Sequence, residues 1–274
     1  MKHAFIIALP RSGTSWLQGM LAFLPEVATV RETHLSDNYL RHLVKSWNSE
    51  QKDPSPDGLK AIMSEAEFYA SLRVFSGRIL NKFLDFKPEA EIILEKTPGN
   101  LHFVELLDRL YPSAYFIHLI RDPRSVVASH LALKQEDWSW LNSQQNYIDL
   151  ALKWHRGMEK GDRAKTLVKD RLIEIKYENL KSDHNTELIK ITNCLGLKYT
   201  AAELDRLIPQ ASAKDLDNNK TNLPTHHPFF DTRANFFRRG EVDSWQQELT
   251  KEQIIDIESI CRRFMLHHGY KLSS

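Results

Sequence analysis

The sequence predicts an α/β fold in which helices cover both faces of a central parallel sheet. Short apolar runs recur along the chain, and longer segments with helical periodicity separate them. The runs predict strands near residues 3–9, 91–95, 114–120 and 172–176. They are continuously apolar, which is typical of strands buried on both faces of a parallel sheet. The expected architecture is therefore a three-layer sandwich of helices, sheet and helices.

The segments between these runs carry apolar residues at helical spacing. The residues from Glu65 to Phe86 form one apolar stripe, and the segment from Ile254 to Met265 has the same pattern. Pro123, just after the third predicted strand, favours the start of another helix. We expect right-handed helical crossovers to connect the parallel strands.

The stretch after the first strand has the composition of a phosphate-binding loop. Pro10-Arg11-Ser12-Gly13-Thr14-Ser15 leads into a helical pattern, and such a helix start directs backbone N–H groups towards an anion. Against the nucleotide-kinase pattern G-x-x-x-x-G-K-[ST], Ala8 replaces the first glycine and Thr14 replaces the lysine. Because that lysine reaches the β- and γ-phosphates, we expect a P-loop-like fold whose donor lacks a γ-phosphate.

The loop resembles the one with which sulfotransferases hold the 5′-phosphosulfate of 3′-phosphoadenosine 5′-phosphosulfate (PAPS). The resemblance implies that PAPS is the donor, that adenosine 3′,5′-bisphosphate (PAP) is the product, and that no metal ion is needed. The implied donor contacts are Arg11, Ser12, Gly13, Thr14, Ser15 and Trp16. Trp16 would stack on adenine, and a core position is an equal alternative for it. For the loop alone, a simple strand-to-helix connection is the other interpretation.

A second motif follows the predicted strand 114–120. Arg121 and Ser129 stand eight residues apart, which places them on one helix face. The segment resembles the part of sulfotransferases in which an arginine fork and a hydroxyl bind the 3′-phosphate of the donor. Arg121 and Ser129 are implied to have these two roles. An Asp-Pro helix start with solvated arginines is the alternative interpretation.

Two further segments extend the resemblance. Tyr177 follows the predicted strand 172–176 in a Tyr-Glu-x-Leu pattern whose tyrosine lies near adenine in the family, although ordinary packing also explains an aromatic there. The segment that contains Arg238, Arg239 and Gly240 is similar to the basic loop that closes over the 3′-phosphate. The similarity implies that these three residues contact the donor. Because the residues before it contain few aliphatic side chains, we expect a lid over residues 212–240 that bound nucleotide orders.

The resemblance also implies a catalytic set. Sulfuryl transfer needs a base for the acceptor hydroxyl and a cation at the leaving phosphate. Arg11 and Lys96 are the implied cations, and Lys96 is expected where a third strand reaches the same sheet edge. Glu32 is the implied base, since its segment resembles that of tyrosyl-protein sulfotransferases, and His34 is its rival. His34 stands where that branch has an arginine implicated in binding acidic peptide, which puts peptide specificity in doubt.

Composition agrees with one domain over residues 1–274, with residues 35–63 as an insertion that lines the acceptor pocket.

Lys and Arg total 37 against 36 Asp and Glu, which gives no global field for nucleic acid or an anionic membrane. No apolar segment approaches the roughly 20 residues that a transmembrane helix needs, and the first apolar run lacks a cleavage site. We therefore expect a cytoplasmic protein that binds neither nucleic acid nor membrane. No metal-ligand spacing is present.

Two alternative functions come from other classes. One is a P-loop small-molecule kinase that uses ATP and Mg²⁺, which the missing loop lysine and the lack of an evident Walker-B aspartate disfavour. The other is a catalytically idle nucleotide-binding protein, which the joint presence of Arg11, Glu32 and Lys96 disfavours. As acceptor we expect a small or carrier-bound molecule with a hydroxyl group. The oligomeric state leaves no signal in the sequence.

Overall fold

The computed structural model describes residues 1–50, 57–133, 146–208 and 240–273. Within them, five strands form one sheet in the order β2-β3-β1-β4-β5, and every neighbouring pair is parallel. The strands are β1 (Lys2–Ala8), β2 (Val27–Ala28), β3 (Ile92–Lys96), β4 (Tyr115–Ile120) and β5 (Leu172–Lys176). The predicted α/β class with a central parallel sheet is confirmed.

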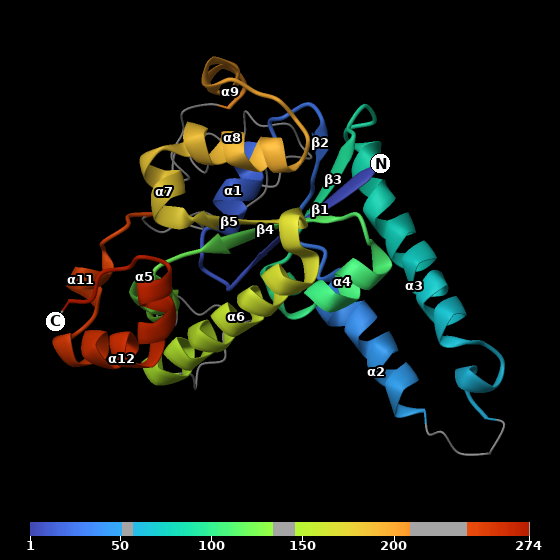
Figure 1. The fold of residues 1–274 in the computed structure, drawn as a ribbon, viewed down its shortest axis with the longest axis horizontal. Helices are drawn as coiled ribbons and strands as arrows, with labels where there is room; N and C mark the ends of the chain where they lie inside the picture. Colours follow the sequence, from blue (N-terminus) through green and yellow to red (C-terminus); the bar gives the residue numbers. More distant parts are fainter. Residues whose placement is uncertain (51–56, 134–145, 209–239, 274) are drawn as a thin grey trace.

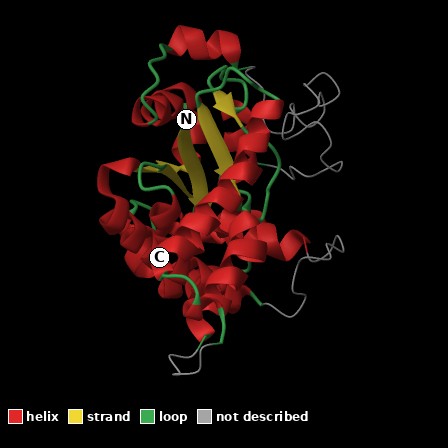
Figure 2. Ribbon diagram, turned by 90° about the vertical axis from the view of Figure 1, so that its right-hand side faces the viewer, coloured by secondary structure: helices red, strands yellow, loops and turns green. Residues whose placement is uncertain are grey.

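Helices cover both faces of the sheet, as Figures 1 and 2 show. One layer contains α1 (Thr14–Leu21), α7 (Tyr177–Ser182), α8 (His184–Cys194) and α9 (Ala201–Leu207). The other contains α3 (Glu65–Leu80), α4 (Val104–Leu110), α5 (Pro123–Leu133), α6 (Tyr147–Val168) and α12 (Lys251–His267). Further connections contain short turns of 3₁₀-helix, η3 (Asn81–Asp85), η4 (Pro98–His102) and η6 (Lys169–Arg171), and the short helix α11 (Trp245–Glu248).

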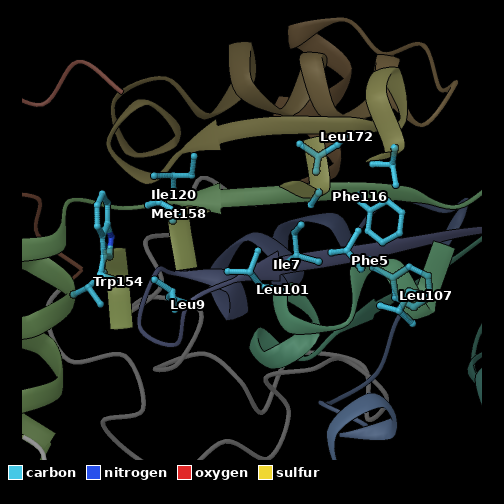
Figure 3. Packing of buried hydrophobic residues seen from close by; sticks show 14 of the residues in the cluster. Phe5, Ile7, Leu9, Leu101, Leu107, Phe116, Ile120, Trp154, Met158 and Leu172 are labelled. Atoms are coloured by element: carbon cyan, nitrogen blue, oxygen red, sulfur yellow. The ribbon is translucent and has the colours of Figure 1, made fainter. Parts of the chain in front are cut away.

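Successive residues of β1 pack into two different cores. Phe5 and Ile7 belong to the cluster under α3, α4 and α6, where Figure 3 shows them beside Leu101 and Leu107. Ala4, Ile6 and Ala8 belong to the cluster under α1 and α8. Because both faces are covered, every position of the strand from Ala4 to Ala8 is apolar, and this explains the continuous run in the sequence.

The carboxyl ends of the central strands lie at one edge of the sheet. In the strand register, Ile6 of β1 is paired with Lys96 of β3 on one side and with Ile117 of β4 on the other. Ile120 of β4 is paired in turn with Lys176 of β5. The chain segments that leave β1, β3, β4 and β5 therefore emerge together, as expected for a ligand site in an open parallel sheet.

The helix starts have a local explanation. Four helices begin with a side-chain capping box, in which the first residue and a partner three positions later satisfy each other's backbone N–H groups. The pairs are Ser64/Glu67 at α3, Asn146/Asp149 at α6, Thr200/Glu203 at α9 and Thr250/Gln253 at α12. In the described part of the chain, no helix is both long and apolar enough to cross a bilayer.

The expected insertion at residues 35–63 contains its own short helices where it is described. They are η1 (Leu35–Leu40), a π-helical turn, α2 (Arg41–Ser49) and η2 (Leu59–Ala61). Trp47 of α2 stacks on Phe68 of α3, with ring centroids 4.4 Å apart. Since η1 contacts η4, which follows β3, the segment begins beside the edge where the central strands end.

The structure differs from the expected elements in detail. The two-residue strand β2 is not predicted, because it is too short to give a periodic signal. The apolar stripe from Glu65 to Phe86 is divided between α3 and η3, so the α-helix ends at Leu80. The strand expected at 91–95 runs one residue further, which makes Lys96 its last residue.

Candidate active site

The loop between β1 and α1 makes a tight turn. Arg11 (φ 71°) and Gly13 (φ 95°) have left-handed backbone conformations. The N–H of Ser12 donates to the carbonyl of Leu9 at 3.3 Å, which closes the turn. Helix α1 then begins at Thr14, and Gly13 supplies no side-chain cap. A helix start of this kind offers its first-turn N–H groups to an anion.

Tyr177, the first residue of α7, packs against this loop. A Cβ atom at Gly13 would lie 2.5 Å from two atoms of the Tyr177 ring, so the ring requires glycine there. The phenol O–H donates to the carbonyl of Gly240 at 2.8 Å. Burial raises the pKa of Tyr177, against the opposing charge of Arg121, and the phenol stays a neutral donor. The predicted residues Gly13, Tyr177 and Gly240 are thus brought together.

Arg121, which follows β4, contacts both Tyr177 and the loop. Its guanidinium carbon is 4.2 Å from the Tyr177 ring centroid. One terminal nitrogen donates to the carbonyl of Arg11 and the other to that of Glu241, both at 3.1 Å. Its Nε is buried and has no hydrogen-bond partner among the described residues. With 8% of the residue exposed, Arg121 holds a cation and an unused donor beside the loop.

Ser129 is connected to the same loop from the side of α5. Arg11 Nε donates to Ser129 Oγ at 3.1 Å, and Ser129 is buried. Arg11 therefore contacts both predicted phosphate ligands: Ser129 through its side chain and Arg121 through its carbonyl. The two motifs that are 110 residues apart in sequence form one cationic assembly in space.

Trp16 lies in the first turn of α1, directly after the loop. The residue is 6% exposed, and its ring meets that of Tyr177 edge to face at a centroid separation of 5.7 Å. Lys181 Nζ lies 5.2 Å from the indole centroid. The indole N–H has no hydrogen-bond partner among the residues that the structure describes. The side chain belongs to the core cluster under α1 and α8, which is the packing role that the sequence left open beside adenine stacking.

Lys96, the last residue of β3, joins the loop to the segment after β2. Only 3% of the residue is exposed. Its Nζ donates to Ser15 Oγ at 3.0 Å and forms an ion pair with Glu32 Oε1. A buried ammonium is stable only with such partners. Lys96 and Glu32, predicted separately as cation and base, are therefore in direct contact at the start of α1.

His34 and Asp37 extend this ion pair. His34 Nε2 lies 3.4 Å from Glu32 Oε2, and Nδ1 lies 3.2 Å from Asp37 Oδ2. The imidazole is thus placed between two carboxylates, with 45% of its side chain exposed. The predicted rivals Glu32 and His34 are neighbours in one chain of groups, and Asp37 had no predicted role.

Glu95 is a further polar residue for which the sequence gave no role. It is 3% exposed, and its Oε1 accepts hydrogen bonds from the hydroxyls of Thr33 and Thr97, each at 2.7 Å. Asn100 Nδ2 donates to its other oxygen. Glu95 thereby ties the segment that carries Glu32 to the end of β3. The available signal was a carboxylate inside an otherwise apolar strand.

A second buried network holds the start of α5. The Arg124 guanidinium pairs with Asp122 and with Glu258 of α12, each at 2.6 Å, and stacks on Trp245 at 4.0 Å. Burial by itself lowers the pKa of Arg124, but the hydrogen bonds and charges of Asp122 and Glu258 outweigh it and raise the pKa. The solvated arginine that the alternative interpretation allowed here is wrong, because Arg124 is 5% exposed.

Some predicted residues fall outside the described part of the chain. These are Arg238 and Arg239, together with the predicted lid up to residue 239. Gly240, which directly follows them, is described and receives the Tyr177 hydrogen bond. Among the described residues, no group of three His, Cys, Asp or Glu side chains is arranged to hold a metal ion.

Comparison with known proteins connects this site to one family. The model of the sulfotransferase family matches residues 4–201. A putative protein-tyrosine sulfotransferase of Caenorhabditis briggsae is 25% identical over 270 residues, covering 98% of this chain and 89% of that protein. The protein-tyrosine sulfotransferase of Drosophila melanogaster is 26% identical over 208 residues, which are 74% of this chain but only 40% of the fly protein.

A solved structure has the same fold. Mouse sulfotransferase SULT7A1 complexed with PAP superposes with a TM-score of 0.63 at 19% identity, covering 96% of this chain and 84% of the mouse chain. The family match spans well over half of the sequence and includes the loop, Glu32, Lys96, Arg121 and Ser129. From this match we conclude that the chain belongs to the sulfotransferase family.

Proposed function

We propose that the protein transfers the sulfuryl group of PAPS to an acceptor hydroxyl. The observation that carries the proposal is Lys96, a buried cation held between Ser15 of the phosphate loop and the carboxylate of Glu32. A cation at the loop and a carboxylate beside it are the two groups that in-line sulfuryl transfer requires. Family membership supports the same reaction class.

The donor would bind across the carboxyl edge of the sheet. The turn at residues 10–15 and the uncapped start of α1 fit the 5′-phosphosulfate, since both features favour an anion. Arg121 has a buried Nε to which no described residue is hydrogen-bonded, and Ser129 is linked to the loop through Arg11, so this pair fits the 3′-phosphate. The complex of the mouse relative with PAP agrees with a donor of this kind.

Each catalytic residue has a separate task in the transfer. Glu32 accepts the proton of the attacking hydroxyl while the new O–S bond forms. Lys96 and Arg11 stabilise the charge that develops on the phosphate oxygen as its bond to sulfur breaks. The ion pair with Lys96 holds the Glu32 carboxylate beside Ser15 of the phosphate loop.

The acceptor would be a small or carrier-bound molecule with a hydroxyl group. The segment from His34 through η1 and α2 begins beside Glu32, and its first element, η1, contacts the turn η4 after β3. We assign the lining of the acceptor pocket to this segment, residues 35–63. The names of the worm and fly relatives point to tyrosine hydroxyls, but His34 departs from the arginine of that branch.

Calorimetric titration tests the donor. The purified protein, without added metal, is titrated with PAP, AMP, ADP and ATP, the last two with and without Mg²⁺. We expect PAP to bind about 10–100-fold more tightly than AMP, because its 3′-phosphate adds charge-assisted hydrogen bonds of about 1.5–3 kcal/mol. Arg121→Met should remove most of this preference, while Arg41→Met on α2 should retain it. Tighter binding of ATP with Mg²⁺ would contradict the proposal in favour of the kinase.

Turnover is tested without knowledge of the acceptor, because water can replace it. The slow conversion of PAPS to PAP and sulfate is followed by chromatography. Glu32→Gln should bind PAP as the wild type does and lose this conversion, since the amide cannot take the proton. If wild type and Glu32→Gln both bind PAP but neither converts PAPS, the protein is a catalytically idle binder.

A further inference from the structure

A chain of ionisable side chains leads away from Glu32. Glu32 Oε1 pairs with Lys96, and Glu32 Oε2 lies 3.4 Å from His34 Nε2. The second ring nitrogen, Nδ1, lies 3.2 Å from Oδ2 of Asp37 in the first turn of η1. The carboxylate of Glu32 thus has one oxygen on a fixed cation and the other on a group that can gain and lose a proton.

The backbone holds this imidazole in place. His34 has a left-handed conformation (φ 50°), and its N–H donates to Thr97 Oγ1 at 3.2 Å. Thr97 is in turn bound to Glu95. Asp37 Oδ1 is buried and has no hydrogen-bond partner among the described residues, so the carboxylate depends on the contact of Oδ2 with His34 Nδ1. The backbone of His34 is therefore anchored to Thr97, directly after β3, and its ring is held by Asp37 of η1.

Two carboxylates facing one imidazole determine where its protons lie. When Nδ1–H donates to Asp37, Nε2 presents a lone pair to Glu32. A lone pair opposite a carboxylate oxygen is unfavourable until a proton lies between the two atoms. The transfer reaction supplies such a proton at the moment when Glu32 takes it from the attacking hydroxyl.

We infer that His34 and Asp37 form a relay that carries the reaction's proton from Glu32 to solvent; the inference rests on the proposed function. The proton leaves Glu32 Oε2 for the lone pair of His34 Nε2, and Glu32 becomes a carboxylate again. The imidazolium then stands between two anions and releases the proton to water through its exposed side, of which 45% is accessible. Asp37 acts as a positioning residue, because it fixes the tautomer in which Nε2 can accept.

The tautomer is measured without turnover. Long-range ¹H–¹⁵N spectra of the labelled protein at alkaline pH distinguish imidazoles protonated on Nδ1 from those protonated on Nε2. Loss of one signal set in His34→Gln identifies His34 among the twelve histidines. We expect the Nδ1–H tautomer in the wild type and a shift towards Nε2–H in Asp37→Ala. Asp85→Ala, which removes an exposed carboxylate of η3, should leave it unchanged. An Nε2–H tautomer in the wild type overturns the relay.

The relay itself is tested by PAPS conversion in water. His34→Gln should lower kcat by about 10²-fold, the lower end of the range for proton-transfer catalysis, while PAP affinity stays within about twofold. His34→Ala should regain activity when imidazole is added, because the side chain lies at the surface. His267→Gln, which replaces an exposed histidine at the end of α12, is the matched control and should behave as the wild type. A merely structural role for His34 would not respond to imidazole.

The outcomes separate this inference from the proposed function. If Glu32→Gln loses PAPS conversion but His34→Gln has the kcat of the wild type, Glu32 remains the base and the relay is wrong. An impaired His34→Ala that imidazole does not restore also overturns the relay. If Glu32→Gln converts PAPS as fast as the wild type, the proposed base itself is wrong, whatever the histidine variants do.

Discussion

At the scale of single residues, Lys96 has two partners that come from different parts of the chain. Ser15 belongs to the first turn of α1, and Glu32 belongs to the segment after β2. A lysine loses much conformational freedom when it is buried, and only contacts of this strength compensate for that loss. The side chain therefore links the loop after β1 to Glu32, the proposed base, in addition to its proposed role as a cation.

Replacement of this lysine by methionine should chiefly affect turnover. Lys96→Met keeps an unbranched side chain but removes the charge at the leaving phosphate. We expect kcat for PAPS conversion to fall by about 10²–10³-fold, equivalent to about 3–4 kcal/mol of transition-state stabilisation. Lys82→Met removes a lysine from an exposed ion pair with Asp85 and should leave kcat unchanged. An unchanged kcat in Lys96→Met would refute its role.

Gly13 gives a second residue-scale prediction. Gly13→Ala places a Cβ 2.5 Å from the Tyr177 ring in a backbone conformation that costs other residues about 1–2 kcal/mol. We expect lower thermal stability and weaker PAP binding, because the ring must leave the loop. Gly77→Ala in α3 meets nothing within 4 Å and should raise stability by roughly 0.5–1 kcal/mol. Normal PAP affinity in Gly13→Ala would show that the contact with Tyr177 does not shape the site.

At the scale of elements, the junction between β4 and α5 depends on α12. Arg124 pairs with Asp122 at the start of α5 and with Glu258 in the middle of α12. At the same junction, Trp154 Nε1 of α6 donates to the carbonyl of Arg121 at 2.9 Å. Arg121 is thus positioned by packing between α5, α6 and α12, none of which contributes the site's own catalytic groups.

Disruption of this network should destabilise the whole fold. Arg124→Met leaves the buried carboxylates of Asp122 and Glu258 without their cation, and breaking a buried pair in this way costs about 3–5 kcal/mol. Urea unfolding measures the loss. The matched control is Arg156→Met on the exposed face of α6, which should change stability by less than about 0.5 kcal/mol. A similar small change in Arg124→Met would mean that the network contributes little to folding.

The elements that could be predicted from sequence are those with a repeated local pattern. The apolar runs predicted four strands because both sheet faces are covered, and the stripe in α3 predicted its helix. The loop at residues 10–15 and Arg121 could be placed at one sheet edge, since parallel strands end together. β2 could not be predicted, because two residues carry no periodicity.

The pairings within the site depend on tertiary contacts that a local pattern does not contain. Glu95 and Asp37 lack a motif of their own, and their roles arise when the ends of β2 and β3 come together. Arg124 shows the same limit: an arginine near a helix start usually faces solvent, but here α12 covers it. In contrast, the family resemblance put Lys96 and Glu32 in one catalytic set, and the two side chains are in contact.

At the scale of the whole molecule, two cores share one sheet, and the site lies where the two meet. The loop after β1 crosses from one face to the other, so its geometry depends on both helical layers. Helix α5 contributes to this dependence through Ser129, which faces Arg11, and through His130, which lies next to it in sequence.

His130 predicts how global stability changes with pH. Burial lowers its pKa to about 4, with smaller contributions from Arg11 and Lys153, against a hydrogen bond from Nδ1 to the carbonyl of Val126. The folded pKa is below that of the unfolded chain, about 6.5. This stabilising contribution is therefore present above about pH 6.5 and lost as pH falls towards 4.

Urea unfolding at a series of pH values tests this sign. Between about pH 6.5 and 4, the wild type should lose more stability than His130→Gln, because the variant has no imidazole to protonate. His42→Gln should follow the wild type, since its imidazole is exposed. Parallel curves for the wild type and His130→Gln would contradict the expected protonation.

The sheet order has a consequence for how the chain is made. β1 is the central strand, yet both strands that flank it, β3 and β4, are synthesised later, with β3 beginning only at residue 92. Until then, the nascent segment has an apolar strand with two open edges, a surface that chaperones protect from aggregation. The loop gains Tyr177 and the Gly240 carbonyl later still. A ribosome-bound chain should therefore acquire the proposed affinity for nucleotide only after residue 240 has been synthesised, when the sheet has formed.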